Sequence, residues 1–298
     1  MSGYIQSDKI QKIHENMEEL KKKIEEFHID QSKENCPTLA VLIGGTGSGK
    51  STFMHILANK KLIVKEDSYK NKILESETSW DEFKIGHDHS SETEIPGIWF
   101  DRKRNVIFCD CPGFFDTKGS AQDIVNIFSI VTLLNQVKKV KLVLMISQDV
   151  GESYRAQNSK KQFDIVNKMS EVKFSEKGIC MIITQTEEEL RTPRKIEAFL
   201  DGMGAFDEKE EPVLNILAKE SEKRIFILEN PEELEVNEEY NKFTEADMER
   251  FMKFINNKND YYKPKDKVPL NESALLFILS VINSLDRMNS IIHEFVIQ

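Results

Sequence analysis

The sequence predicts an α/β fold in three layers, with a mainly parallel β-sheet covered by helices on both faces. Short continuous apolar runs alternate with amphipathic stretches along most of the chain, as expected for parallel strands that are buried on both sides. The 298 residues, 39% hydrophobic and 31% charged, are enough for one large domain with helical extensions. We therefore expect an N-terminal helix within residues 1–36, a main domain over 37–257, and a linker with a C-terminal helix over 258–298.

The two ends of the chain are predicted to form amphipathic helices. The first covers about Ser7 to His28, where apolar side chains recur at steps of three and four residues. We expect this apolar side to pack on the main domain, with pairing to another helix as the alternative. The second covers about Glu272 to Phe295 and carries a similar stripe. That stripe requires a packing partner in its own domain, in the N-terminal helix or in a second protomer.

Six apolar runs are the predicted strands of the sheet. The second and third are joined by a short charged loop and predict an antiparallel hairpin, so one edge strand runs against the others. Helices are expected at about Gln122 to Lys138 and Gln157 to Met169, between Glu187 and Lys219, and at Glu245 to Asn256. The polar segment from Lys61 to Glu94 shows no strong periodicity. The predicted strands are Leu39–Ile43, Ile95–Phe100, Val106–Cys109, Val140–Ile146, Gly178–Thr184 and Arg224–Leu228.

The most informative stretch is Gly44 to Ser51, GGTGSGKS, which fits the phosphate-binding P-loop pattern G-x-x-x-x-G-K-[ST] of P-loop NTPases. It lies between a predicted strand and a predicted helix. Glycines let successive backbone N–H groups point at phosphate oxygens, and the helix N-terminus adds partial positive charge. Lys50 would reach the β- and γ-phosphates, and Ser51 would ligate Mg²⁺. The alternative is a glycine-rich turn with a coincidental Lys-Ser. The predicted nucleotide-binding residues here are Gly45, Thr46, Gly47, Ser48, Gly49, Lys50, Ser51 and Thr52.

A second motif, Asp110-Cys111-Pro112-Gly113, follows the third predicted strand and has the form D-x-x-G. In this motif the Asp holds Mg²⁺, usually through water, and the Gly N–H senses the γ-phosphate. A Pro-Gly turn after a strand is the simpler alternative. Because a P-loop precedes the motif, we interpret Asp110 as a metal-binding residue and Gly113 as a catalytic one.

Together, GGTGSGKST and DCPGFFDT resemble the septin-related (paraseptin) GTPases, most closely the immunity-associated nucleotide-binding (GIMAP-like) group, whose relatives include the Toc chloroplast-import receptors. The resemblance covers about Thr38 to Asn230. It implies a G domain that binds GTP or GDP with Mg²⁺. It also implies that Thr93 is the first-switch threonine, which contacts Mg²⁺ and the γ-phosphate and acts in catalysis beside Lys50 and Gly113.

The resemblance further implies where the base binds. Thr184-Gln185-Thr186-Glu187 takes the place of the guanine-specificity box [NT]-K-x-D, with Gln185 instead of Lys and Glu187 instead of Asp. A glutamate can still accept hydrogen bonds from guanine N–H groups, but its extra methylene changes its reach. The box therefore does not decide whether the preferred base is guanine or adenine. Asn230 resembles the base-contacting Asn after the last strand. Its alternative role is that of a turn residue before Pro231.

The implied activity is hydrolysis of GTP to GDP and phosphate, used as a switch. The rate is expected to be low because Phe114 follows Gly113, where a water-orienting glutamine would be needed. A partner, or a homodimer formed through the nucleotide face or the terminal helices, would then complete the site. Arg155 is a candidate trans-acting arginine, with an ordinary surface arginine as the simpler interpretation. Two other functions stay open: an ATP-using P-loop NTPase, and a nucleotide-binding scaffold (pseudo-GTPase) with relaxed base specificity.

Composition argues against several other classes. The net charge of −10 is wrong for a general nucleic-acid binder, which needs excess Lys and Arg. No apolar run reaches the roughly 18–20 residues that span a bilayer, and the first residues lack the apolar core of a secretory signal. The cysteines have no C-x-x-C spacing, so we expect reduced structural thiols and a cytoplasmic protein. They are Cys36, Cys109, Cys111 and Cys180.

Overall fold

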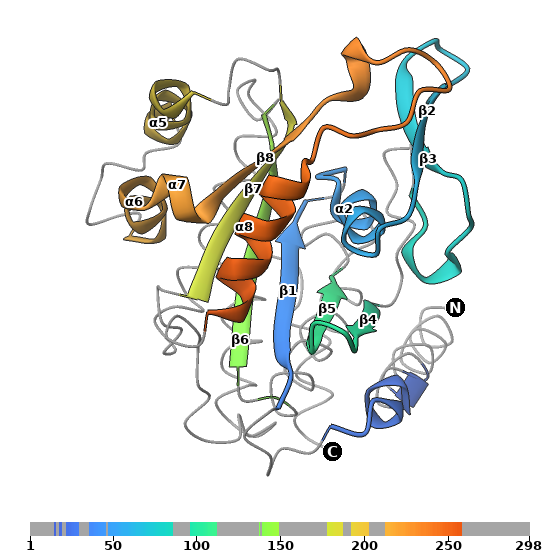
Figure 1. Cartoon of the computed structure of the whole chain (residues 1–298), viewed down its shortest axis with the longest axis vertical. Coiled ribbons are helices and arrows are strands. Elements are labelled where there is room, and N and C mark those ends of the chain that lie inside the picture. Colours follow the sequence, from blue (N-terminus) through green and yellow to red (C-terminus); the bar gives the residue numbers. More distant parts are fainter. Residues whose placement is uncertain are drawn as a thin grey trace, which may run out of the picture.

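The computed structural model describes residues 15, 18–19, 22–29, 36–45, 47–85, 96–111, 137, 139–148, 178–186, 192–202 and 212–257. Within these residues, besides part of an N-terminal helix, the chain forms eight strands, five α-helices and two short 3-10 helices, and Figure 1 shows how the labelled elements are arranged. In chain order the elements are β1 (Thr38–Gly44), α2 (Lys50–Leu57), β2 (Leu62–Glu66), β3 (Lys72–Ser76), η1 (Asp81–Phe83), β4 (Gly97–Asp101), β5 (Val106–Asp110), β6 (Lys139–Ser147), β7 (Ile179–Thr186), α5 (Pro193–Gly202), α6 (Pro212–Lys219), α7 (Ser221–Arg224), β8 (Ile225–Glu229), η5 (Pro231–Glu233) and α8 (Glu245–Asn256).

The main sheet has six strands in the order β4-β5-β1-β6-β7-β8. All neighbours are parallel except the edge pair β4 and β5, which form the predicted antiparallel hairpin. β1 lies in the middle, with Leu42 opposite Asp110 of β5 and Gly44 opposite Met145 of β6. The register therefore places the end of β5 beside the loop that follows β1, at the carboxyl ends of the strands, where ligands bind in sheets of this kind.

Two hydrophobic clusters lie on opposite faces of this sheet. Alternate strand residues such as Leu39 and Val41 face the first cluster, which includes Leu200 of α5 and Leu217 of α6. The residues between them, such as Ala40, face the second cluster, to which α2 and α8 contribute. Figure 1 shows α8 crossing in front of the sheet beside α2. The three-layer α/β fold with a mainly parallel sheet and one antiparallel edge strand is thus confirmed.

α8 has the boundaries predicted from the sequence, Glu245 to Asn256. Its start is defined by a capping box, in which the Thr244 hydroxyl accepts from the Asp247 N–H and the Asp247 carboxylate accepts from the Thr244 N–H. The buried face of the helix presents Phe251, which packs edge-on against Phe53 of α2 and Phe226 of β8, both at 5.3 Å between ring centroids. These edge-on contacts connect α2, the helix that follows the P-loop, to β8, the last strand of the sheet.

The segment without periodicity, Lys61 to Glu94, contains an antiparallel hairpin of β2 and β3 that forms a second small sheet. A distant stretch extends it. The Val64 N–H donates to the Glu238 carbonyl at 2.9 Å, the Asn237 N–H to the Val64 carbonyl at 2.7 Å, and the Tyr240 N–H to the Leu62 carbonyl at 2.9 Å. Residues 237–240 therefore lie along the edge of β2. The hairpin was not predicted because its apolar alternation is interrupted by charged residues.

The N-terminal helix is seen in part, since Glu15, Glu18–Glu19 and Lys22–Glu26 are helical. Ile24 is buried in the first cluster, and Phe27 packs against it, in agreement with packing on the main domain. The helix predicted at 157–169, the C-terminal helix and Arg155 fall outside the described residues, as does the helix predicted at 122–138 except for Val137, which is buried and not helical. All four cysteines are buried and free of disulfides, as expected.

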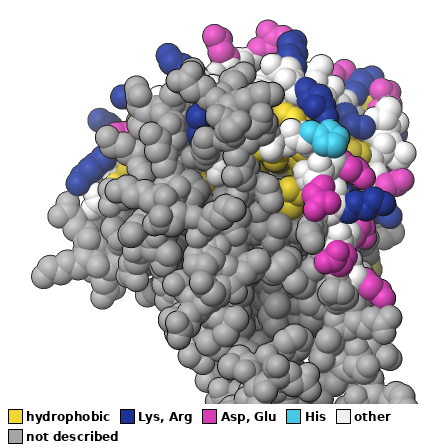
Figure 2. Space-filling view, turned by 90° about the horizontal axis from the view of Figure 1, so that it is seen from below, with side chains coloured by type: hydrophobic (Ala, Val, Ile, Leu, Met, Phe, Trp, Pro, Cys, Tyr) yellow, Lys and Arg dark blue, Asp and Glu magenta, His cyan; other side chains and the backbone are white. Residues whose placement is uncertain are grey.

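The described surface mixes both signs of charge. On the face seen in Figure 2, Lys and Arg side chains lie next to Asp and Glu side chains, so its described part presents no large field of one sign. Among the described residues, no helix combines the length and apolarity needed to cross a bilayer.

Candidate functional site

The loop between β1 and α2 has the tight curl that the P-loop pattern predicts. Gly47 and Gly49 adopt positive φ angles of 77° and 78°, a conformation that L side chains rarely take, and Gly49 caps the start of α2. Gly44 leaves no room for a side chain, because a Cβ there would lie 2.4 Å from the Ser48 Oγ and 2.5 Å from the Met145 carbonyl oxygen. The glycines therefore fold the loop back over the end of β1, with the N-terminus of α2 at its base.

Lys50, the first residue of α2, places its ammonium group inside this curl. Its Nζ donates to the carbonyl oxygens of Gly44 and Gly45, each at 2.9 Å, and the residue is 7% exposed. A cation held by the loop's own carbonyls is ready to exchange those contacts for phosphate oxygens. This position is compatible with contact to phosphates, and the role of Lys50 stays a prediction.

Ser51 and Asp110 meet although 59 residues separate them in sequence. The Ser51 hydroxyl donates to the Asp110 Oδ2 at 2.7 Å, which joins the start of α2 to the end of β5. The other carboxylate oxygen, Oδ1, is buried and has no hydrogen-bond partner among the described residues. A hydroxyl and a carboxylate with one unsatisfied oxygen are oxygen ligands of the kind that Mg²⁺ prefers, so these two side chains suit a magnesium site.

Burial raises the pKa of Asp110, and the charge of Lys50 and the hydrogen bond from Ser51 offset this only in part. A carboxyl whose pKa is raised in the folded state contributes stability below its ordinary pKa of 3.8, and this contribution is lost as pH rises through the raised value. The site therefore holds a carboxylate whose charge is costly unless a cation neutralises it.

Replacing this carboxylate by its neutral amide should stabilise the ligand-free protein. For D110N we expect a melting temperature above that of the wild type at pH 7, with the difference shrinking as pH falls towards 4, because protonation then neutralises Asp110 in the wild type. Thermal unfolding followed by circular dichroism between pH 4 and 8 measures this difference in melting temperature. The matched control is D81N, at an exposed carboxylate of η1. A D110N difference that stays constant over this range would contradict the expectation.

The end of β7 packs against the P-loop. Thr184 is buried, and its hydroxyl donates to the Ser48 carbonyl at 3.1 Å. Gln185 adopts a left-handed conformation with φ 53°, and its Nε2 donates to the Gly47 carbonyl at 3.4 Å while its Oε1 accepts from the Ser147 hydroxyl. Ser147 was not predicted as a site residue. Its position as the last residue of β6, beside β7, was the available signal.

Asn230 lies at the same edge as this box. Its N–H donates to the Thr186 carbonyl at 2.9 Å, and Thr186 pairs with Glu229 after a β-bulge in β7. The Thr186 hydroxyl is buried and has no hydrogen-bond partner among the described residues. The register of β7 and β8 thus brings Asn230 next to the predicted base-contacting segment, while Asn230 also precedes Pro231 as the N-cap residue of η5, so both predicted roles stay open.

The predicted site residues within the described part of the chain gather at one end of the sheet. They are Gly45, Gly47, Ser48, Gly49, Lys50, Ser51, Thr52, Asp110, Thr184, Gln185 and Asn230. Four others fall outside the described residues: Thr46, Thr93, Gly113 and Glu187. Their predicted roles stay predictions.

No protein-family model matches the chain, and no curated protein matches its sequence. Among solved structures, it is similar to Toc33 from Arabidopsis thaliana in complex with GDP and Mg²⁺, with 14% identity, a TM-score of 0.43, and coverage of 84% of this chain and 95% of that one. It is also similar to a mutation variant of SsGBP, with 11% identity, a TM-score of 0.39, and coverage of 82% of this chain and 61% of that one. The fold assignment rests on the sheet order and the loop geometry.

Proposed function

We propose that this chain is a GTP-binding switch protein that binds GTP and GDP with Mg²⁺ and hydrolyses GTP slowly. The observation that supports it most is the contact of Ser51 with Asp110 at 2.7 Å, directly beside the buried ammonium of Lys50. These are the side chains that a P-loop site needs for the metal and for the β- and γ-phosphates. Their convergence from two motifs distant in sequence is hard to reconcile with a chance glycine-rich turn.

In the proposed mechanism the residues of the chain act mainly by charge and position. Lys50 leaves the carbonyls of Gly44 and Gly45 for phosphate oxygens, and the N–H groups at the start of α2 donate to the same phosphates. Ser51 and Asp110 are the residues that would hold the Mg²⁺. Bound Mg²⁺ supplies neutralisation of the charge that builds up during phosphoryl transfer. By the sequence resemblance, Thr93 and Gly113 complete the γ-phosphate contacts.

The preference for guanine is supported by the D-x-x-G motif and by the position of Asn230, and less by the box at 184–187. Gln185 is engaged with the P-loop and with Ser147, where the family pattern has a lysine. This departure favours the two other candidates, a nucleotide-binding scaffold (pseudo-GTPase) with relaxed base specificity and an ATP-using P-loop NTPase. A homodimer through the nucleotide face or the terminal helices is the proposed route to a complete catalytic site.

Isothermal titration calorimetry separates these functions. In Mg²⁺, we expect GDP and a non-hydrolysable GTP analogue to bind at least about tenfold more tightly than the matching ATP analogue, a difference of about 1.4 kcal/mol. Removal of Mg²⁺ with EDTA should lower the affinity for the GTP analogue more than the affinity for GDP, since the γ-phosphate adds metal contacts. Equal or tighter binding of the ATP analogue would contradict the proposal, and no binding of any nucleotide would exclude the nucleotide-binding scaffold as well.

A further inference from the structure

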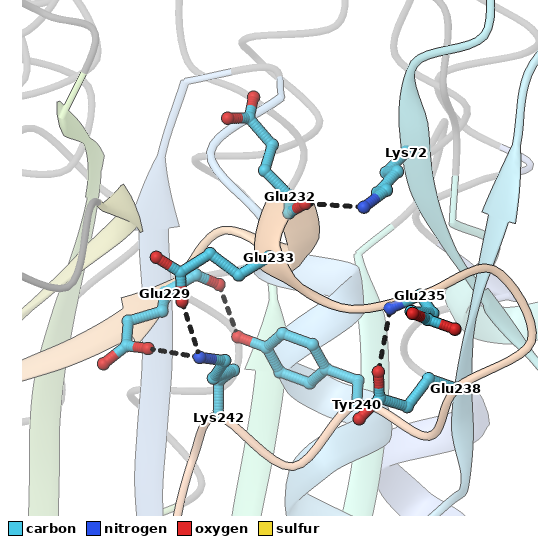
Figure 3. Close-up of polar contacts among 8 residues, drawn as sticks. All are labelled: Lys72, Glu229, Glu232, Glu233, Glu235, Glu238, Tyr240 and Lys242. Atoms are coloured by element: carbon cyan, nitrogen blue, oxygen red, sulfur yellow. Dashed lines mark hydrogen bonds and ion pairs between the residues drawn. The ribbon is translucent and has the colours of Figure 1, made fainter.

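Asn230 lies in the loop that follows β8. Figure 3 shows that Lys72 and Lys242 contact this loop from two sides. Lys242 donates to Glu229 at 3.5 Å and to Glu233 at 3.1 Å. Glu229 is the residue before Asn230, and Glu233 ends the short helix η5 that begins after it. One ammonium group therefore links the two ends of the turn that contains Asn230.

The ion pair between Lys242 and Glu229 matters for stability because the Glu229 side chain is buried. It is 6% exposed, and a buried carboxylate needs a cation or hydrogen bonds to offset its lost hydration. The backbone of Glu229 is held as well, because the Tyr240 hydroxyl donates to its carbonyl oxygen at 2.5 Å. The neighbouring contact with Glu233 raises the pKa of Lys242, so that lysine stays charged over the physiological range.

The segment that supplies Lys242 is anchored to the P-loop helix. Phe243, the next residue, packs edge-on against Phe53 of α2 at 5.3 Å between ring centroids. On the opposite side of the turn, the Lys72 ammonium of β3 donates to the Glu232 carbonyl at 2.6 Å. The turn is thus fixed to the same helix whose start forms the phosphate site.

We propose that Lys242 is a positioning residue, which sets Asn230 for the base of a bound nucleotide by clasping Glu229 and Glu233. The inference rests on the proposed nucleotide binding. It assigns Lys242 no contact with the nucleotide. Its effect passes through the turn and concerns the base, because Lys242 pairs with the carboxylates on both sides of Asn230, whereas the predicted phosphate-site residues Lys50 and Ser51 bind the P-loop carbonyls and Asp110.

Two ligands separate base positioning from general damage: GDP, which has a base, and inorganic tripolyphosphate, which has none. For K242M we expect GDP affinity to fall about tenfold while tripolyphosphate affinity stays within about twofold of the wild type. K242R should restore GDP affinity, since a guanidinium can also reach two carboxylates. The matched control is K65M, which removes a half-buried lysine of β2 that donates to Asn237 at 2.7 Å on the same small sheet but touches neither end of the turn. It should change neither affinity. Calorimetry in Mg²⁺ measures both ligands.

Three results would overturn the inference. Unchanged GDP affinity in K242M would show that the clasp does not position the base. An equal loss for GDP and tripolyphosphate would show a general effect on the fold. If the wild type binds neither ligand, the proposed function itself is refuted. If the wild type and K242M bind both ligands with the same affinities, only the inference about Lys242 is refuted.

Discussion

Replacement of Lys50 by methionine is expected to reduce the affinity for GTP by a factor on the order of 10² to 10³. Lys50 is buried, and its ammonium lies between two loop carbonyls at 2.9 Å, where a phosphate chain would take over its hydrogen bonds. Charge-assisted hydrogen bonds contribute about 1.5–3 kcal/mol each, so the loss of one or two of them accounts for this factor. Phosphate release from GTP should fall to the buffer background.

The measurement is calorimetry with a non-hydrolysable GTP analogue, together with a phosphate-release assay on purified K50M. The control is K253M, at an exposed lysine on α8, which should bind as the wild type does. Thermal unfolding of both variants shows whether the fold is retained. Affinity for the GTP analogue within threefold of the wild type in a folded K50M would refute the P-loop assignment.

Truncation of Phe251 to alanine is expected to lower the free energy of unfolding by about 3–5 kcal/mol. The ring is fully buried and packs edge-on against Phe53 and Phe226, so its removal leaves a cavity where α8 meets α2 and β8. The rings of Phe53 and Phe226 both lose contacts with Phe251. Partial collapse of the surrounding side chains into the cavity therefore recovers little of the lost free energy of unfolding.

Urea unfolding followed by tryptophan fluorescence measures the effect. The comparison variant is Y69A, which removes an aromatic ring of similar size that is 84% exposed at the turn between β2 and β3. Y69A should change the free energy of unfolding by less than about 0.5 kcal/mol. A loss below about 1 kcal/mol in F251A would mean that α8 does not pack on the sheet in solution as described.

Most of the main sheet could be predicted from the sequence, because its strands are buried on both faces and their apolar runs are continuous. The limits of α8 could also be predicted, since its N-terminal Thr244 and Asp247 form a local capping box. The hairpin of β2 and β3 could not. Only alternate residues such as Leu62 and Val64 are fully buried, and the stretch that completes its pairing lies far along the chain. Pairing between distant segments leaves no local signal.

The candidate site divides in the same way. The phosphate loop and Asp110 could be predicted because short motifs encode their geometry locally. The contacts of Gln185 with Ser147 and Gly47, and the clasp made by Lys242, could not. They depend on a left-handed residue at a β-bulge and on the path of a loop after the last strand. Both are consequences of the assembled fold.

The pairing of β2 with residues 237–240 also bears on how the chain folds as it is synthesised. Lys65 and Asn237, which join the two segments, are 172 residues apart, so the edge of β2 is made long before the stretch that covers it. Until then the nascent domain exposes an unpaired strand edge and the apolar face that α8 later covers. Such contacts of high sequence separation slow folding and leave intermediates prone to aggregation. Native packing of α2 against Phe251 therefore waits until α8 has left the ribosome.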